Sequence, residues 1–265
     1  NAQLDRLFLD HHQEWATKLD IEMPEEQALI ASDKNVRIVN GVPGSGKTLI
    51  AVNRALMLCE MHPEQRVLIL IHNTPIVADI SARLERALGA LPKNLEIATF
   101  YSWVFRQWRA EYAAIPNMVS EDEVIALISN FLPNVVGLGL STKQLNEEID
   151  FIHESMLTEL DAYLNVDRTG RGFGLRSKGR EQVWQVFCHV KEKLSQRRRK
   201  LWSELPPTIC LSASSAANRL HKYDHILVDE AQFFAPSWFE LVKLSRTHGG
   251  HLFLCADPNQ GFMRA

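Results

Sequence analysis

The sequence predicts an α/β fold, in which a parallel sheet flanked by helices is interrupted by a mostly helical insertion. Five short apolar runs are typical of buried strands, at residues 36–39, 67–71, 95–98, 226–228 and 252–255. Helical patterns follow the first three runs, as parallel strands joined by crossover helices require. Between the third and fourth runs the pattern predicts helices, at residues 121–131, 142–164 and 180–195.

The helical stretch divides the α/β domain into two segments along the chain. We expect residues 3–104 and 206–265 to form one discontinuous domain, with residues 105–205 inserted as a helical subdomain. Residues 1 and 2, Asn-Ala, lack an initiator methionine and are interpreted as the remnant of a cleaved tag.

The composition is typical of a globular protein from a reducing compartment. Of the 265 residues, 46% are hydrophobic and 23% are charged, and no apolar run approaches the ~20 residues of a membrane span. The four cysteines are widely spaced and form no CxxC pair, which disfavours a metal site or a disulfide framework. We therefore expect a cytoplasmic protein without a membrane partner.

The first strand runs directly into a glycine-rich loop of the pattern GxxxxGK[ST], and an apolar helix follows it. Glycines allow positive φ angles, so that backbone N–H groups and the helix N-terminus turn toward one anion. Lys47 is expected to reach the β- and γ-phosphates of a nucleotide, and Thr48 to hold Mg²⁺. The predicted nucleotide-binding residues of this loop are Gly41, Val42, Pro43, Gly44, Ser45, Gly46, Lys47, Thr48 and Leu49.

Two acidic residues follow the fourth strand in the stretch ILVDEAQ. The carboxyl ends of parallel strands open onto the ligand crevice, so Asp229 is expected to hold Mg²⁺ and Glu230 to activate the attacking water as a general base. The fifth strand ends in ADPNQ, where Gln260 is suited to sense the γ-phosphate or the lytic water. Taken alone, this last stretch is only a turn pattern.

The charge of the chain is unevenly distributed. Residues 165–200 contain eleven basic and three acidic residues, although the net charge of the whole chain is −3. Such a segment is typical of a surface that binds a polyanion, and Arg197, Arg198 and Arg199 form its densest part. The alternative is a solvated helix face balanced by nearby acids.

Five stretches occur in order between Gly41 and Gln260, and the match extends back to Pro24: GVPGSGKT, LILIHNTPIVADISARL, ATFYSW, ILVDEAQFF and LFLCADPNQ. Together they resemble the UvrD/Rep-like branch of superfamily I helicases. The resemblance implies a P-loop NTPase of RecA-like fold, the ATP-hydrolysing half of an ATP-dependent DNA helicase or translocase that uses ATP and Mg²⁺. It also implies single-stranded or partly duplex DNA as the partner, and a second RecA-like domain of the same protein beyond Ala265.

The resemblance also assigns residues by position. Gln27 matches the glutamine that reads the adenine edge, Arg54 an arginine in the helix behind the phosphate loop, and Gln260 the γ-phosphate sensor. Hydroxyls, amides and aromatic rings bind a nucleic-acid strand without reading its sequence. The residues that match segments in contact with single-stranded nucleic acid are Asn73, Thr74, Thr99, Phe100 and Ser102.

Other functions fit parts of the pattern. An RNA helicase, or a translocase that moves along DNA without unwinding it, shares these motifs. A nucleotide-gated nucleic-acid-binding module belongs to another class, since hydrolysis would serve it only as a timer. A simple P-loop kinase accounts for the phosphate loop but not for DEAQ or Gln260.

Overall fold

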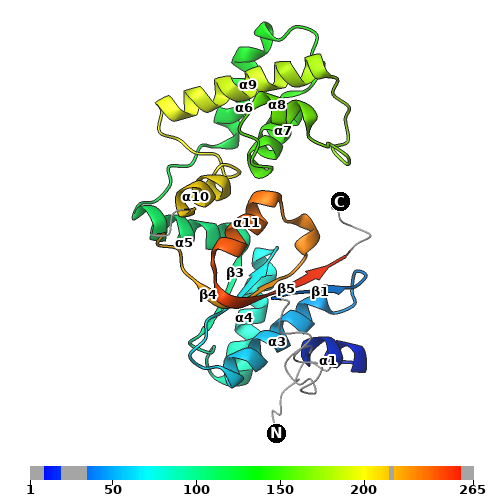
Figure 1. Cartoon of the computed structure of the whole chain (residues 1–265), viewed down its shortest axis with the longest axis vertical. Helices are drawn as coiled ribbons and strands as arrows, with labels where there is room; N and C mark the ends of the chain where they lie inside the picture. The colour runs from blue at the N-terminus through cyan, green and yellow to red at the C-terminus, as the bar shows by residue number, and fades with distance from the viewer. Residues whose placement is uncertain (1–8, 19–34, 215–217, 258–265) are drawn as a thin grey trace. The chain divides into compact units, whose positions relative to one another are not determined.

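The computed structural model describes residues 9–18, 35–214 and 218–257, which belong to two compact units. Of the described residues, the sheet unit comprises 9–18, 35–103, 221–234 and 245–257, and the helical unit comprises 104–214, 218–220 and 235–244. Figure 1 shows the strands side by side in the first unit and a packed group of helices in the second.

The sheet unit contains a five-stranded sheet in the order β1-β5-β4-β2-β3, in which every neighbouring pair is parallel. All five residues of β2 are buried, as expected for a strand covered on both faces. The predicted α/β class is therefore confirmed, and each predicted run lies within a strand. The strands are β1 (Val36–Asn40), β2 (Val67–Ile71), β3 (Leu95–Thr99), β4 (Tyr223–Val228) and β5 (Arg246–Ala256).

The register brings the carboxyl ends of the strands to one edge of the sheet. Asn40 at the end of β1 pairs with Ala256, and Val228 at the end of β4 pairs with both Leu254 and Leu70. The glycine-rich loop follows β1 and the two acids follow β4. These segments therefore meet at the same edge, although 181 residues separate Thr48 from Asp229 in the sequence.

Among the described residues, three helices lie wholly in the sheet unit: α1 (His11–Lys18), α3 (Lys47–Met61) and α4 (Thr74–Leu88). Helix α3 presents two small, fully buried residues, Ala51 and Ala55, to the same core as Ile69 of β2. Small side chains allow close packing of a helix on a sheet, and this fixes the position of the α3 N-terminus. Helix α5 (Phe100–Tyr112) begins directly after β3 and continues into the helical unit.

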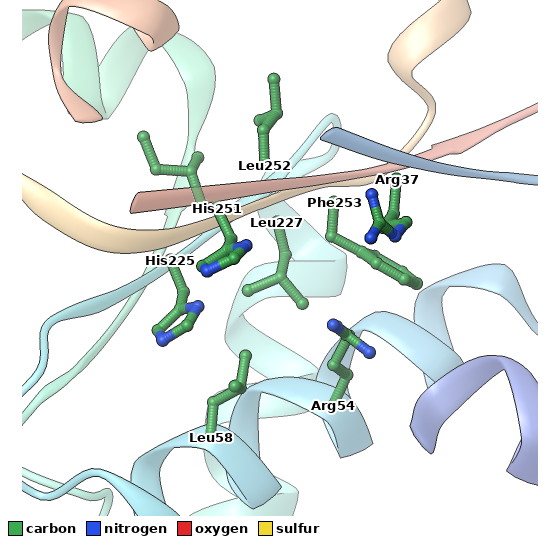
Figure 2. Close-up of a pocket in the computed structure, with 9 residues that line it drawn as sticks. Arg37, Arg54, Leu58, His225, Leu227, His251, Leu252 and Phe253 are labelled. Carbon is green, nitrogen blue, oxygen red and sulfur yellow. The ribbon is translucent and has the colours of Figure 1, made fainter. Parts of the chain in front are cut away.

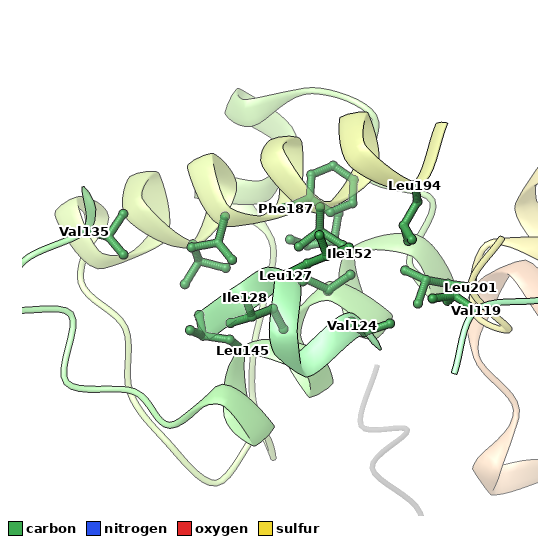
Figure 3. Packing of buried hydrophobic residues seen from close by; sticks show 14 of the residues in the cluster. Val119, Val124, Leu127, Ile128, Val135, Leu145, Ile152, Phe187, Leu194 and Leu201 are labelled. Atoms are coloured by element: carbon green, nitrogen blue, oxygen red, sulfur yellow. The ribbon is translucent and has the colours of Figure 1, made fainter. Parts of the chain in front are cut away.

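The helical unit is built around a buried cluster that α6, α7 and α9 share (Figure 3). The predicted helices at residues 121–131 and 180–195 are confirmed, the second as part of a longer α9. The helices of this unit after α5 are α6 (Glu121–Phe131), α7 (Thr142–Glu154), α8 (Leu160–Asn165), α9 (Ser177–Gln196), α10 (Leu205–Ala213) and α11 (Pro236–Leu244). None of the helices in the described ranges is both long and apolar enough to cross a bilayer.

The single helix predicted at residues 142–164 is wrong, because α7 and α8 are separate. Met156 has a left-handed conformation with φ of 56°, and the N–H of Leu157 donates to the carbonyl oxygen of Ile152 at 3.0 Å. This pattern of bonds is one that ends helices. Ile152 and Tyr163, on either side of the break, are buried in the same cluster, so the apolar pattern continues through it.

The boundaries of the compact units differ from the sequence-based division. Residues 206–214, 218–220 and 235–244 belong to the helical unit because α10 and α11 pack together, with Cys210 Sγ 3.7 Å from the carbonyl oxygen of Ser237, and both helices also contact α7. As a division into functional domains, 3–104 with 206–265 and 105–205 stays a prediction. Residues 1 and 2 lie outside the described residues.

Candidate nucleotide site

The glycine-rich loop forms a tight turn between β1 and α3. Gly44 and Gly46 have positive φ angles of 76° and 82°, which residues with a Cβ rarely adopt. The N–H of Gly41 donates to the carbonyl oxygen of Ala256 at 3.0 Å, which ties the loop to the end of β5. Lys47 is 5% exposed, and its Nζ donates to the carbonyl oxygens of Gly41 (3.0 Å) and Val42 (3.2 Å). The ammonium group is thus held inside the loop.

The loop offers donors to an anion. Helix α3 begins at Lys47, and no side chain among the described residues caps it, so its first N–H groups and its positive dipole end remain available. The Oγ of Ser45 is buried, and no described residue forms a hydrogen bond with it. A Cβ added to Gly41 would lie 2.5 Å from that Oγ, so the loop closes tightly around it. A phosphate group fits this set of donors.

Thr48 and Asp229 come together at the start of α3. Thr48 Oγ1 donates to Asp229 Oδ2 at 2.5 Å, and the N–H of Asp229 donates to the carbonyl oxygen of Leu70 at 2.9 Å. Burial raises the pKa of the Asp229 carboxyl, and the charge of Glu230 adds to the rise, against the hydrogen bond from Thr48. A hydroxyl and a carboxylate in contact are oxygen ligands that suit Mg²⁺, whose charge would favour the ionised Asp229.

Glu230 is held from two sides. Its backbone is left-handed, with φ of 52°, and its N–H donates to Asp229 Oδ1 at 3.1 Å. The Nε2 of Gln232 donates to the Glu230 carboxylate, while the Oε1 of Gln232 accepts from the N–H of Asp257 at 3.0 Å. Gln232 is 6% exposed, so this link between the acid and the end of β5 is buried. Gln232 was not predicted as a site residue from the sequence, although it belongs to the DEAQ stretch.

Residues 23–263 match the family model described as the UvrD/REP helicase N-terminal domain. The chain belongs to this family. It is also 26% identical over 261 residues to a probable DNA helicase II homolog from Mycoplasma pneumoniae, and the match covers 91% of this chain and 35% of that protein. The chain therefore spans about a third of the length of this curated relative.

In this UvrD/REP N-terminal domain, Arg54 lies two helical turns beyond Lys47 and is 6% exposed. Its Nη1 donates to the carbonyl oxygen of Thr17 at 3.0 Å, and its guanidinium carbon is 4.6 Å from the centre of the Phe253 ring. Figure 2 shows Arg54 of α3 and Phe253 of β5 in a small pocket between α3 and the sheet. Two other predicted site residues, Gln27 and Gln260, lie outside the described residues.

The segments predicted to contact nucleic acid follow β2 and β3. Asn73 precedes α4 and does not cap it with its side chain, Thr74 is exposed, and Ser102 donates from Oγ to the carbonyl oxygen of Thr99 at 2.9 Å. Phe100 is 4% exposed, with its ring centre 5.2 Å from that of Phe234. Its ring is buried in the core, and contact of Phe100 with a nucleic-acid strand stays a prediction.

The basic segment is partly engaged within the helical unit. Arg197 donates to Glu123 at 2.7 Å, and Arg199 donates to the carbonyl oxygen of Met118 at 2.8 Å. Arg198 is exposed and has a left-handed backbone with φ of 52°. The three arginines are therefore not equivalent, since Arg197 and Arg199 each donate to another part of the helical unit, whereas Arg198 is exposed without such a contact among the described residues. Within the described ranges, no three His, Cys, Asp or Glu side chains are grouped to hold a metal ion.

Proposed function

We propose that this chain is the ATP-binding and ATP-hydrolysing half of an ATP-dependent DNA helicase or translocase that acts on single-stranded DNA. The contact between Thr48 and Asp229 carries the proposal, because it joins the phosphate loop to the acids after β4. The name of the Mycoplasma pneumoniae relative supports DNA as the substrate. In the whole protein we expect the site to face a second RecA-like domain, and we place the protein in the cytoplasm, where its four free cysteines stay reduced.

Each residue has a distinct task in this proposal. Lys47 and the first N–H groups of α3 bind phosphate oxygens, and Thr48 and Asp229 would hold Mg²⁺. When bound, Mg²⁺ would neutralise charge on the β- and γ-phosphates. Glu230 orients a water molecule and accepts its proton. Asn73, Thr74, Thr99 and Ser102 bind the strand without sequence preference, with Gln27 and Gln260 assigned to adenine and γ-phosphate.

The proposal is tested by ATP turnover of the full-length protein with and without single-stranded DNA. Lys47→Ala is expected to reduce turnover to background, because it removes the buried cation of the loop. Lys143→Ala, which removes an exposed lysine of α7, is the matched control and should turn over normally. Unchanged turnover in Lys47→Ala would refute the assignment.

Strand-displacement assays separate the alternatives. Matched DNA and RNA duplexes distinguish a DNA helicase from an RNA helicase, and ATP turnover without displacement identifies a translocase. In a nucleotide-gated binding module, turnover would not increase with the length of the DNA strand. We expect displacement of the DNA duplex and turnover that increases with strand length.

A further inference from the structure

Helix α1 contacts the phosphate loop through one side chain, Gln13. The Nε2 of Gln13 donates to the carbonyl oxygen of Ser45 at 2.9 Å. Its Oε1 accepts from the N–H of Asp10 at 3.0 Å, and its own N–H donates to Asp10 Oδ1 at 2.8 Å. This reciprocal pair caps the start of α1 and fixes which end of the amide faces the loop. The donor end faces Ser45.

The contacted carbonyl belongs to the peptide group that joins Ser45 to Gly46. In a trans peptide the C=O and N–H point in opposite directions. Holding the Ser45 oxygen toward α1 therefore turns the Gly46 N–H away from α1. That N–H belongs to the residue before Lys47, in the part of the loop that is expected to surround the phosphates.

Gly46 is adapted to this contact in two ways. Its φ of 82° suits glycine, and a Cβ at this position would lie 2.6 Å from Gln13 Nε2. A larger residue would therefore both strain the turn and displace the amide. The glycine before Lys47 accommodates the approach of Gln13 as well as the turn itself.

A second attachment holds α1 in place. Thr17 is 2% exposed, and its carbonyl oxygen accepts from Arg54 Nη1 at 3.0 Å. The Thr17 hydroxyl donates to the carbonyl oxygen of Gln13 at 2.8 Å, and Ala16 is buried in the core that it shares with α3. Arg54 in turn lies over the Phe253 ring of β5. The position of Gln13 is thus set by α3 and the sheet, the elements that carry the loop.

We propose that Gln13 is a positioning residue of the nucleotide site, which orients the Ser45–Gly46 peptide for phosphate binding. Arg54 contributes through α1 and not by touching the nucleotide. The inference rests on the proposed ATPase function. It deepens that function by adding to the nucleotide site a positioning residue, Gln13, that precedes both Gln27 and the phosphate loop in the sequence.

The test compares two substitutions in the full-length protein. Gln13→Ala removes the contact with Ser45 and the acceptor of the Asp10 N–H, while Asp10 Oδ1 can still accept from the backbone N–H of residue 13. Gln13→Glu keeps an oxygen to accept from Asp10 but has no N–H to donate to Ser45. Because one hydrogen bond is involved, both should raise the KM for ATP by about 2- to 10-fold, with kcat changed less than the KM. If Gln13 only caps α1, Gln13→Glu will have the wild-type KM, and the inference is overturned.

Two controls complete the design. His12→Glu adds the same negative charge at an exposed neighbouring position and should leave the KM unchanged, so that charge alone is excluded as the cause. Thermal midpoints of all variants show whether α1 and the sheet unit remain folded. Wild-type turnover that Lys47→Ala does not reduce would refute the ATPase proposal and this inference with it. Turnover that depends on Lys47, with wild-type KM in both Gln13 variants, would refute this inference alone.

Discussion

Glu148 of α7 is the charged centre of the helical unit, and its removal should have a large effect on stability. It is fully buried and accepts from Arg168 Nε at 2.6 Å, Arg168 Nη2 at 2.9 Å and Arg171 Nη2 at 3.1 Å, and from the Tyr163 hydroxyl at 2.7 Å. Glu148→Ala would leave the guanidinium of Arg168, 5% exposed, without its partner. Breaking a buried pair in this way costs about 3–5 kcal/mol.

The contacts that stabilise Glu148 also shift its pKa. Burial alone raises the pKa of the Glu148 carboxyl, but hydrogen bonds from Arg168 and Tyr163 and the charges of Arg168 and Arg171 outweigh it and lower the pKa. A carboxyl with a lowered folded-state pKa contributes stability above its unfolded-state value and loses it as the pH falls. The stability lost in Glu148→Ala should therefore be measured near neutral pH, where Glu148 is ionised and its ion pair with Arg168 is fully formed.

Native-state hydrogen exchange is the assay, because two compact units need not unfold together. Amides of α7 and α9 should lose about 3–5 kcal/mol of opening free energy in Glu148→Ala. Amides of β2, in the sheet unit, are the internal reference. Glu147→Ala, which removes the exposed neighbouring carboxyl, should change little. A loss below about 1 kcal/mol at α7 and α9 in Glu148→Ala would refute the reasoning.

Three other predictions follow from the site and the helical unit. Glu230→Gln should lower ATP turnover by about 10²- to 10⁴-fold while equilibrium ATP binding persists, and joint loss of both would mark Glu230 as structural. Burial and two nearby lysines lower the pKa of His153 to about 3, so acidification favours the unfolded state, which binds the proton. Opening free energies near α7 should fall by about 2 kcal/mol between pH 7 and pH 5, and His153→Leu should flatten this dependence. Replacing Arg198 with Ala should weaken DNA binding and reduce the slope of log K against log salt by about 0.7 to 0.9, without loss of stability. Arg197→Ala and Arg199→Ala should also loosen the contacts with Glu123 and Met118, and an unchanged slope in all three variants would favour a solvated face.

The sheet was predictable because strands of a parallel sheet are continuous apolar runs. The run 67–71, VLILI, is buried at every position, and such a stretch has few alternatives in a globular protein. The first part of β5 was missed because residues such as His248 and Gly249 are exposed and polar or flexible. The break between α7 and α8 was missed because backbone geometry at Met156, and not a change of side-chain pattern, ends the helix.

The candidate site could be proposed from the sequence where one short stretch carries the relevant residue types. The phosphate loop and DEAQ are of this kind, since residue type and spacing reveal them. Contacts between distant segments were not predictable: 32 residues separate Gln13 from Ser45, and 20 separate Glu148 from Arg168. The charge of the basic segment at residues 165–200 could not be judged from that segment alone, because the acids that pair with part of it, Glu123 and Glu148, lie outside it.

The two supporting residues that the sequence did not reveal, Gln13 and Gln232, are both amides, and the site has a physical reason to use them. Each amide donates to one group and accepts from another. Gln13 donates to the Ser45 carbonyl oxygen and accepts from the Asp10 N–H. Gln232 donates to the Glu230 carboxylate and accepts from the Asp257 N–H. A carboxylate in place of either amide could not donate to the Ser45 carbonyl oxygen or to Glu230. At position 232 it would also repel the Glu230 carboxylate. A lysine accepts nothing, and its charge would compete with Lys47 for phosphate or with Mg²⁺ for the acids. A neutral amide with both a donor and an acceptor orients these groups and adds no charge beside Lys47, Asp229 and Glu230, which the proposed function assigns to binding the nucleotide and the metal.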